Sequence, residues 1–287
     1  MEHPALRRLV ELEGGEWPQG SLSERVTTLH EFSARWDFRR GAERLDLKGG
    51  ATTSSDGEIM AAAEELGMTR ADLPLDDAYD HALVLGGTAL ASIYRIQRLF
   101  ELRGASIGVA NSAVLTALRK VDEAELELVT ARGDIAAIAQ GAATEFDVMT
   151  RAVAHFGGGE PRVTRTPNPN PNLAGARADV GETLVLAAPS ADPGRRPNTR
   201  DNYDVYAERI ERSDSVLVVT SSIYLPYQFF IALQALGWNE PRTIEAVGFP
   251  PEWMRGVLTG ASNVLQETRS ALYGAMNTLK LVDGLSP

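Results

Sequence analysis

The spacing of apolar positions changes along the chain and predicts different structures in different parts. Through residues 1–77, apolar side chains recur at helical spacing between short loops. "SLSE" at 21–24 has the form of a capping box, with Ser21 three residues before Glu24. Residues 58–68 are rich in helix-forming side chains and stop at Gly67. We therefore expect an N-terminal helical extension over 1–77.

From residue 78 onward, short apolar runs alternate with longer amphipathic segments. The amphipathic segments 88–104, 143–159, 198–211 and 226–238 predict helices. Strands that alternate with helices of ten or more residues are typical of a parallel sheet covered on both faces. The pattern predicts a three-layer, Rossmann-like α/β domain over 78–250. Its candidate strands are 81–87, 106–112, 126–130, 183–189, 215–222 and 242–250.

Two further segments stand apart from this alternation. Residues 164–182 contain repeated Asn-Pro pairs, which predict an extended loop insertion that is either passive or a lid. Residues 251–287 carry an apolar stripe at helical spacing. We expect a C-terminal helical segment that packs on the core or on a partner subunit, which would make the protein a homo-oligomer.

Composition narrows the classes of function. Of the 287 residues, 44% are apolar and 23% charged, and the net charge of −11 argues against nucleic-acid or anionic-membrane partners. The absence of cysteine excludes disulfides, thiolate nucleophiles and cysteine-ligated zinc. No signal sequence or membrane span is recognisable, so a soluble cytoplasmic protein is expected. The four histidines are scattered and predict no metal site.

Three acidic residues lie around the start of the predicted helix 198–211, namely Asp192, Asp201 and Asp204. They could bind Mg²⁺ next to a phosphate. Solvated acids at the start of a helix explain them more simply, because carboxylates favour the positive end of the helix dipole.

Candidate chemistry follows from the rule that ligands of an open parallel sheet bind at the carboxyl ends of its strands. Gly86 and Gly87 would let a ligand approach the backbone, and Thr88 could cap the next helix or bind an anion. Arg95 lies two helical turns further on and could fold back to this edge. A tight strand-to-helix turn explains the glycines equally well. The other strand ends carry hydroxyls and an amide at Asn111, Ser112, Thr220, Ser221 and Ser222.

Two helix starts complete the predicted crevice. Arg196, Asn198, Thr199 and Asn202 could contact a ligand, or Asn198 and Thr199 could only cap the helix. Beyond Ser222, the next helix begins near Pro226 and presents Tyr224, Tyr227 and Gln228. These tyrosines either border the crevice or pack beneath the loop. The candidate catalytic residues are Tyr224, Tyr227 and Glu145.

The order of these segments resembles the YdcF/SanA/ElyC family of Rossmann-like proteins. The resemblance spans about residues 78–248 and rests on "HALVLGG" with Arg95, on "TEFDVM" with Glu145, on the Asn198-Thr199-x-x-Asn202 helix start, and on "VVTSS". Tyr224 and Tyr227 stand where that family usually carries histidine and arginine. The resemblance implies S-adenosylmethionine or a nucleotide-like ligand as a possible cofactor, without a settled reaction.

We therefore expect a YdcF-like protein that binds a nucleotide-like or other phosphate- or carboxylate-bearing small molecule at the carboxyl edge of the sheet. It could act as a transferase or condensing enzyme that works by orienting its substrates. The alternative is a non-catalytic small-molecule sensor or scaffold protein.

Overall fold

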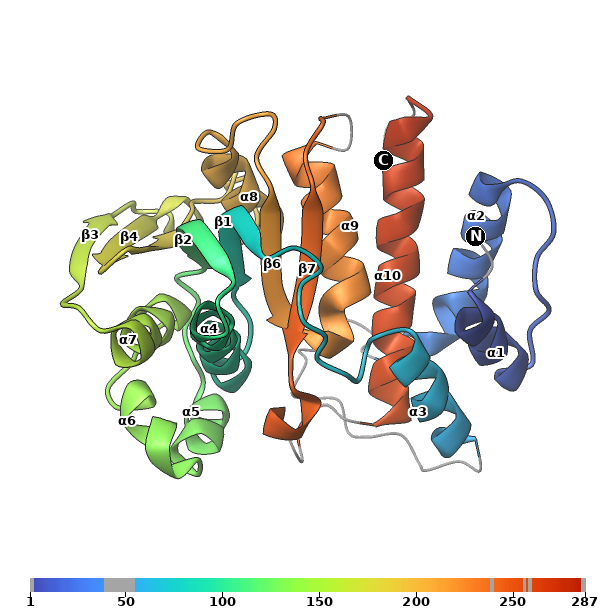
Figure 1. The fold of residues 1–287 in the computed structure, drawn as a ribbon, viewed down its shortest axis with the longest axis horizontal. Coiled ribbons are helices and arrows are strands. Elements are labelled where there is room, and N and C mark those ends of the chain that lie inside the picture. Colours follow the sequence, from blue (N-terminus) through green and yellow to red (C-terminus); the bar gives the residue numbers. More distant parts are fainter. Residues whose placement is uncertain (1–2, 39–54, 238–239, 255–256, 258–259, 285–287) are drawn as a thin grey trace. The chain divides into compact units, whose positions relative to one another are not determined.

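The chain forms two compact units, which Figure 1 shows as ribbons. The computed structural model describes residues 3–38, 55–237, 240–254, 257 and 260–284. The first unit combines Met1–Asp72 with Ser222–Gln234 and Pro250–Pro287, and the second combines Leu73–Ser221 with Ala235–Phe249.

A seven-stranded sheet in the order β3-β4-β5-β2-β1-β6-β7 organises the second unit. The strands β5, β2, β1, β6 and β7 are parallel, and β3 and β4 run antiparallel beside β5. This confirms the predicted α/β class with a mostly parallel sheet. The strand bounds are β1 Ala78–Leu85, β2 Gly108–Thr116, β3 Arg162–Thr166, β4 Gly175–Val180, β5 Thr183–Ala187, β6 Val216–Ser221 and β7 Ile244–Phe249.

The central strands of this sheet are buried on both faces. Every residue of β6 is buried, and so are the last five residues of β1 and of β2. Such strands form continuous apolar runs because helices cover both sides of a parallel sheet. In this unit α4 packs against α7 and against the strands, while α8 contacts β2. The helices are α4 Ala89–Gly104, α5 Glu123–Thr130, α6 Ala136–Ala139, α7 Glu145–Gly157 and α8 Thr199–Ala207.

The first unit is helical and has its own apolar core. Leu9, Trp36, Ile59 and Val264 are among its most buried members. The apolar stripe of α10 belongs to this core, because α10 packs against α2 and α3. The elements are α1 Pro4–Leu12, α2 Leu22–Phe32, η1 Ser33–Trp36, α3 Asp56–Glu65, η5 Ser222–Tyr224, η6 Pro251–Met254 and α10 Ala261–Val282, with most of α9 Leu225–Leu236.

The predicted capping box begins α2. The amide of Glu24 donates to the Ser21 hydroxyl at 3.3 Å, and the amide of Ser21 donates to the Glu24 carboxylate at 2.8 Å. Each side chain therefore satisfies one backbone donor that the first helical turn leaves without an intrahelical partner.

Two predicted elements were wrong. Residues 126–130 are not a strand but part of α5, because the Asp122 carboxylate caps a helix by accepting the amide of Glu125 at 2.8 Å. The predicted loop insertion over 164–182 is instead an antiparallel hairpin in which Thr164 pairs with Arg177. The prolines of this segment all lie between β3 and β4, where no ladder hydrogen bond is required of them.

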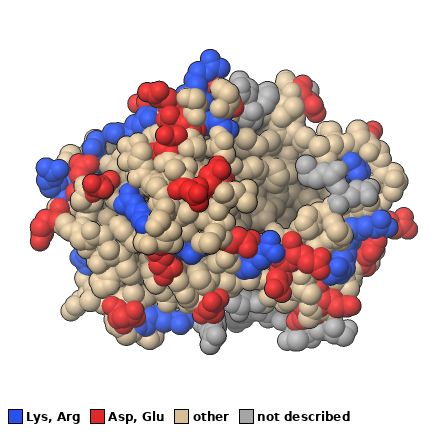
Figure 2. All heavy atoms as spheres, in the orientation of Figure 1, with Lys and Arg blue, Asp and Glu red and all other residues tan. Residues whose placement is uncertain are grey.

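The surface carries charges of both signs. On the face drawn in Figure 2, acidic and basic side chains are interspersed, in keeping with a chain that has 39 acidic and 28 basic residues. Among the described helices, none combines the length and the apolar character that a membrane span needs.

Candidate functional site

At the carboxyl ends of the parallel strands, several predicted side chains lie together within the second unit. Arg95 of α4 folds back to the end of β1 and donates to the carbonyl oxygens of Leu85, at 2.8 Å, and of Gly86. Its Nη2 also donates to the Ser221 hydroxyl at the end of β6, at 3.0 Å. Arg95 is only 1% exposed. The guanidinium therefore connects the ends of two neighbouring strands.

A second guanidinium at this edge joins two buried carboxylates. Arg119 follows β2, and its Nε donates to Glu145 at 2.6 Å while its Nη1 donates to Glu125 at 2.6 Å. Glu145 also accepts the Thr116 hydroxyl at 3.0 Å, and Glu125 accepts the first amide of α4 at 2.6 Å. Burial raises the pKa of the Glu145 carboxyl, although Arg119 opposes this effect.

Gly86 and Gly87 leave space for these side chains of the protein itself. A Cβ atom on Gly86 would lie 2.0 Å from Oε1 of Glu145, and one on Gly87 would lie 3.0 Å from Nη1 of Arg95. The sequence suggested that the glycines admit a ligand to the backbone. In the structure, the atoms that occupy this space belong to Glu145 and Arg95.

The start of α8 is satisfied by hydrogen bonds within the chain. The Asn198 side chain accepts the amides of Arg200 and Asp201, at 2.9 and 3.2 Å. The Asn202 amide group accepts from the Ala188 amide at 3.0 Å and donates to the carbonyl of Thr116 at 2.9 Å. These contacts tie α8 to the ends of β5 and β2, so Asn198 caps the helix and Asn202 holds the two strand ends.

Asp201, at the start of α8, is a carboxylate held by several hydrogen bonds. It accepts two hydrogen bonds from the Arg195 guanidinium, at 2.6 and 2.8 Å, and the backbone amides of Ala191 and Asn198 at 2.9 and 2.7 Å. Burial raises the pKa of Asp201, but these hydrogen bonds outweigh it and lower the pKa to about 2. Asp204 pairs with Arg200 on the surface.

The remaining predicted residues lie in several places. Thr88 precedes α4 and makes no side-chain capping bond. Thr199 is the first residue of α8, and Arg196 is exposed just before it. Within the described part of the chain, the buried Thr220 hydroxyl has no hydrogen-bond partner. Four others belong to the first unit, where Ser222 and Tyr224 lie in η5 and Tyr227 and Gln228 in α9.

Asn111 and Ser112 were placed at the wrong edge of the sheet. The sequence suggested that the second strand ends there, but β2 continues to Thr116. Ser112 pairs in register with Ala82 and Thr183, near the amino ends of β1 and β5. Its hydroxyl lies 2.8 Å from that of Thr183. Asn111 and Ser112 are polar residues inside a strand, and their polarity was mistaken for the end of the strand.

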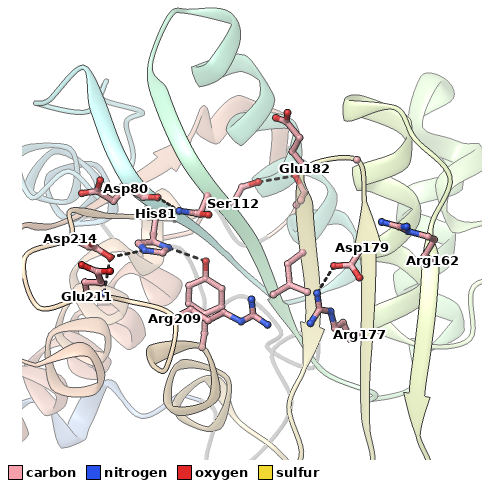
Figure 3. Close-up of a pocket in the computed structure, with 15 residues that line it drawn as sticks. Asp80, His81, Ser112, Arg162, Arg177, Asp179, Glu182, Arg209, Glu211 and Asp214 are labelled. Atoms are coloured by element: carbon pink, nitrogen blue, oxygen red, sulfur yellow. Dashed lines mark hydrogen bonds and ion pairs between the residues drawn. The ribbon is translucent and has the colours of Figure 1, made fainter.

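A groove of about 640 Å³ opens at this amino edge (Figure 3). We call it the amino-edge groove. Its lining comes from the first halves of β1, β2 and β5, from the β3–β4 hairpin, and from the segment that joins α8 to β6. The sequence had set this edge aside, because ligands of open α/β sheets usually bind at the opposite one.

Three arginines line the amino-edge groove, two on the β3–β4 hairpin and one on the segment that follows α8. Arg177 of β4 donates to Asp179 at 2.7 Å. Arg162 of β3 and Arg209, which follows α8, have no hydrogen bond or ion pair from their guanidiniums to any described residue. The hydrogen bond from Arg177 lowers the pKa of Asp179, and the charges of Arg162 and Arg209 lower it further. Around the β3–β4 hairpin, these positive charges therefore lie near two acidic lining residues, Asp179 and Glu182.

The other end of the groove contains a fixed histidine. Nε2 of His81 lies 2.9 Å from the Asp214 carboxylate, and Nδ1 lies 3.1 Å from the Tyr206 hydroxyl. His81 is 4% exposed, and burial raises the pKa of Tyr206. Both ring nitrogens are engaged, so the imidazole has one orientation. From the sequence, the four histidines were found to be scattered, so His81 was not among the candidate site residues.

No described group of three or more histidine or acidic side chains is arranged to hold a metal ion. Of the acids that the sequence offered for Mg²⁺, Asp201 pairs with Arg195 and Asp204 with Arg200, while Asp192 accepts the amide of Gly194.

Comparison with known proteins finds relatives without an assigned function. Residues 1–67 match the model of the Rv3785 N-terminal domain. The chain is 29% identical over 322 residues of alignment to the uncharacterized proteins Rv3785 of Mycobacterium tuberculosis and Mb3814 of Mycobacterium bovis. The alignment covers 98% of this chain and 88% of each relative. No solved structure matches the chain significantly.

The resemblance to the YdcF/SanA/ElyC family was wrong. The family model that matches is the Rv3785 N-terminal domain, and the alignments with Rv3785 and Mb3814 span nearly the whole chain. The motifs misled because each has a local structural purpose: Gly86 accommodates Glu145, and Asn198 caps α8. The expectation of S-adenosylmethionine rested on that resemblance and is withdrawn with it.

Proposed function

We propose that this protein binds a small molecule carrying a phosphate or carboxylate group, and that the molecule binds in the amino-edge groove. The observation that carries the proposal is the pair Arg162 and Arg209, whose guanidiniums make no hydrogen bond or ion pair with any described residue. Arginine presents a planar set of donors that matches phosphate and carboxylate oxygens. Two such groups beside Arg177 form a binding site for an anion.

The size of the groove agrees with this class of ligand. About 640 Å³ lies within the range of roughly 300–1,000 Å³ that small-molecule sites occupy. Its floor is formed by strands, with Ser112 and Thr183 fixed by their mutual hydrogen bond. Side chains on strands hold their positions better than side chains on loops, so the site is preorganised.

The carboxyl edge is a poorer anion site because its donors are already used. Nε of Arg119 donates to Glu145, Nη1 to Glu125 and Lys120, and Nη2 to Glu125 and Gly87, which accounts for all five N–H groups. The first amide of α4 donates to Glu125. An anion at this edge would therefore have to displace a buried carboxylate, which is costly.

The carboxyl edge nevertheless supplies a second candidate location. The charges of the buried Arg95 and Glu145 and of the partly buried Arg119 gather where parallel sheets usually bind ligands, and ionisable groups with perturbed pKa values are enriched at functional sites. Thr88, whose hydroxyl makes no capping bond, is partly exposed beside them. A ligand bound here would contact Thr88.

Isothermal titration calorimetry on the full chain, with pyrophosphate and adenosine 5′-monophosphate in low salt, tests the proposal. Arg162→Gln and Arg209→Gln should each weaken binding roughly 10- to 100-fold, since a hydrogen bond to a charged group contributes about 1.5–3 kcal/mol. Arg200→Gln is the matched control, because Arg200 is an exposed residue of α8 that pairs with Asp204.

Each outcome assigns or removes a site. If binding survives the Arg162→Gln/Arg209→Gln double substitution, the amino-edge groove is not the binding site. Loss of binding in Thr88→Ala would then favour the carboxyl edge as the site. Absence of binding by both ligands to the unaltered chain would refute the proposal. Chemical conversion of a bound ligand would distinguish a transferase or condensing enzyme from a non-catalytic sensor or scaffold.

A further inference from the structure

The charged residues of the amino-edge groove are mostly separated by sign along the sheet, with Asp179 and Glu182 near the arginines of the hairpin and Arg209 on the segment of Glu211 and Asp214 as the exceptions. Arg162 and Arg177 lie on β3 and β4, whereas Asp80 lies in β1 and Asp214 lies two residues before β6. Figure 3 shows the two arginines on one side of the groove, and Asp80, Asp214 and Glu211 on the other. Because β5 and β2 lie between β4 and β1, the two ends are about three strand spacings, or roughly 14 Å, apart.

The acidic end has oxygen atoms available to accept hydrogen bonds. Asp80 uses Oδ2 for both the amide and the hydroxyl of Ser215, at 2.8 Å each. Asp214 likewise uses Oδ2 for both His81 and the amide of Glu211. No hydrogen bond joins any described residue to Oδ1 of Asp80, to Oδ1 of Asp214 or to the Glu211 carboxylate. Three carboxylates therefore keep unused acceptors at one end of the groove.

An ordinary anion would be attracted to only one end of such a groove. At the β3–β4 end a phosphate meets Arg162 and Arg177, with the charge of Arg209 in reach, against Asp179 and Glu182, whereas at the β1–β6 end it meets three carboxylates that repel it. An ammonium or hydroxyl group has the opposite preference, because carboxylates accept hydrogen bonds and favour positive charge. Between the ends, Ser112 and Thr183 are uncharged.

We infer that the ligand of the amino-edge groove is two-ended, with its phosphate or carboxylate on Arg162, Arg177 and Arg209 and a hydrogen-bond-donating amine or hydroxyl group on Asp80, Glu211 and Asp214. The inference rests on the proposed function, since it assumes that the anionic end binds there. It adds that the ligand is extended along the sheet and that its two ends are chemically different.

A matched pair of ligands tests the second end separately from the first. Hexyl phosphate and 6-aminohexyl phosphate share their phosphate and chain and differ in the terminal ammonium. Calorimetry on the full chain should give at least fivefold tighter binding for 6-aminohexyl phosphate. Glu211→Gln should reduce this preference at least twofold, and Asp80→Asn/Glu211→Gln should bring the two affinities within twofold of each other.

Glu208→Gln is the control variant, because Glu208 is exposed at the end of α8 and does not line the groove. It should leave the preference unchanged. Equal affinities in the unaltered chain would overturn the two-ended ligand and leave phosphate binding standing. A preference that persists in Asp80→Asn/Glu211→Gln would also overturn it. Failure of both ligands to bind would refute this inference together with the proposed function.

Discussion

Replacing Gly86 by alanine tests the account of the carboxyl edge. The added Cβ would lie 2.0 Å from Oε1 of Glu145, well inside van der Waals contact. Gly86 does not lie in the left-handed region of backbone conformation, so alanine itself introduces no backbone strain. The carboxylate would therefore have to leave its position between Thr116 and Arg119.

The expected cost follows from the contacts that this displacement breaks. Glu145 would lose hydrogen bonds of 3.0 Å from Thr116 and 2.6 Å from Arg119, each contributing about 1.5–3 kcal/mol because the acceptor is charged. Substitution of glycine by alanine also reduces the entropy of the unfolded chain, which offsets about 0.4–1 kcal/mol. The free energy of unfolding should fall by about 3–5 kcal/mol, as for other broken buried ion pairs.

Guanidinium unfolding at pH 7, followed by circular dichroism, measures this change. Gly104→Ala is the control, because Gly104 ends α4 and a Cβ there would have no neighbour within 4 Å. That variant should be neutral or up to about 1 kcal/mol more stable.

A double-mutant cycle separates the proposed clash from other effects. In a Glu145→Ala background the clash with the carboxylate is absent, and the added Cβ keeps a contact of 3.1 Å with the carbonyl oxygen of Leu115. Gly86→Ala should therefore cost less than about 1 kcal/mol in that background, and the coupling should exceed about 2 kcal/mol. Additive effects of the two substitutions, or a loss below about 1 kcal/mol for Gly86→Ala alone, would refute the reasoning.

Three further perturbations should give measurable effects. The pKa of Asp201 is about 2 in the folded protein, against an ordinary 3.8, so the unfolded carboxyl binds protons more readily. This difference contributes about 2 kcal/mol to the free energy of unfolding above pH 3.8, and the contribution is lost as the pH falls through 2. The free energy of unfolding should therefore fall less steeply with decreasing pH in Asp201→Asn than in the unaltered chain. In the exposed Asp204→Asn it should fall with the same slope as in the unaltered chain. Asn202→Ala leaves backbone groups of β2 and β5 without partners and should cost about 2–4 kcal/mol in urea unfolding; a loss under 1 kcal/mol would contradict that assignment. Tyr206→Phe removes the partner of Nδ1 of His81 and should lower stability by about 1 kcal/mol in thermal unfolding, where no change would argue against the contact.

Local patterns were sufficient to predict most of the fold. The apolar runs at 81–85 and 216–219 are buried strands, and the helices between them follow from amphipathic spacing. Ambiguity arose where a pattern fits two structures. "LELVT" suits a strand or a helix, and the capping contact from Asp122 decides for the helix. Proline forbids ladder bonds only at its own position, so strands on both sides of 167–171 remain possible.

The candidate site was harder to predict because its members are distant in sequence. The second strand was predicted to end at Ser112, whereas it ends at Thr116. Arg119, which lies just beyond the true end, was therefore not recognised as a candidate site residue. Arg162 and Arg177 are brought to the amino-edge groove by the order of the strands, which places β3 and β4 beside β5, and Arg209 is brought there by the segment that follows α8. No spacing rule connects Arg162, Arg177 and Arg209, so the sequence offered no signal for them.

Nuclear magnetic resonance of the side-chain Nε–H groups in ¹⁵N-arginine-labelled protein tests the central claim most directly. During titration with pyrophosphate, we expect the signals of Arg162 and Arg209 to shift in a saturable manner and those of Arg95 and Arg119 to stay in place. Shifts confined to Arg95 and Arg119, with Arg162 and Arg209 unaffected, would contradict the assignment of anion binding to the amino-edge groove.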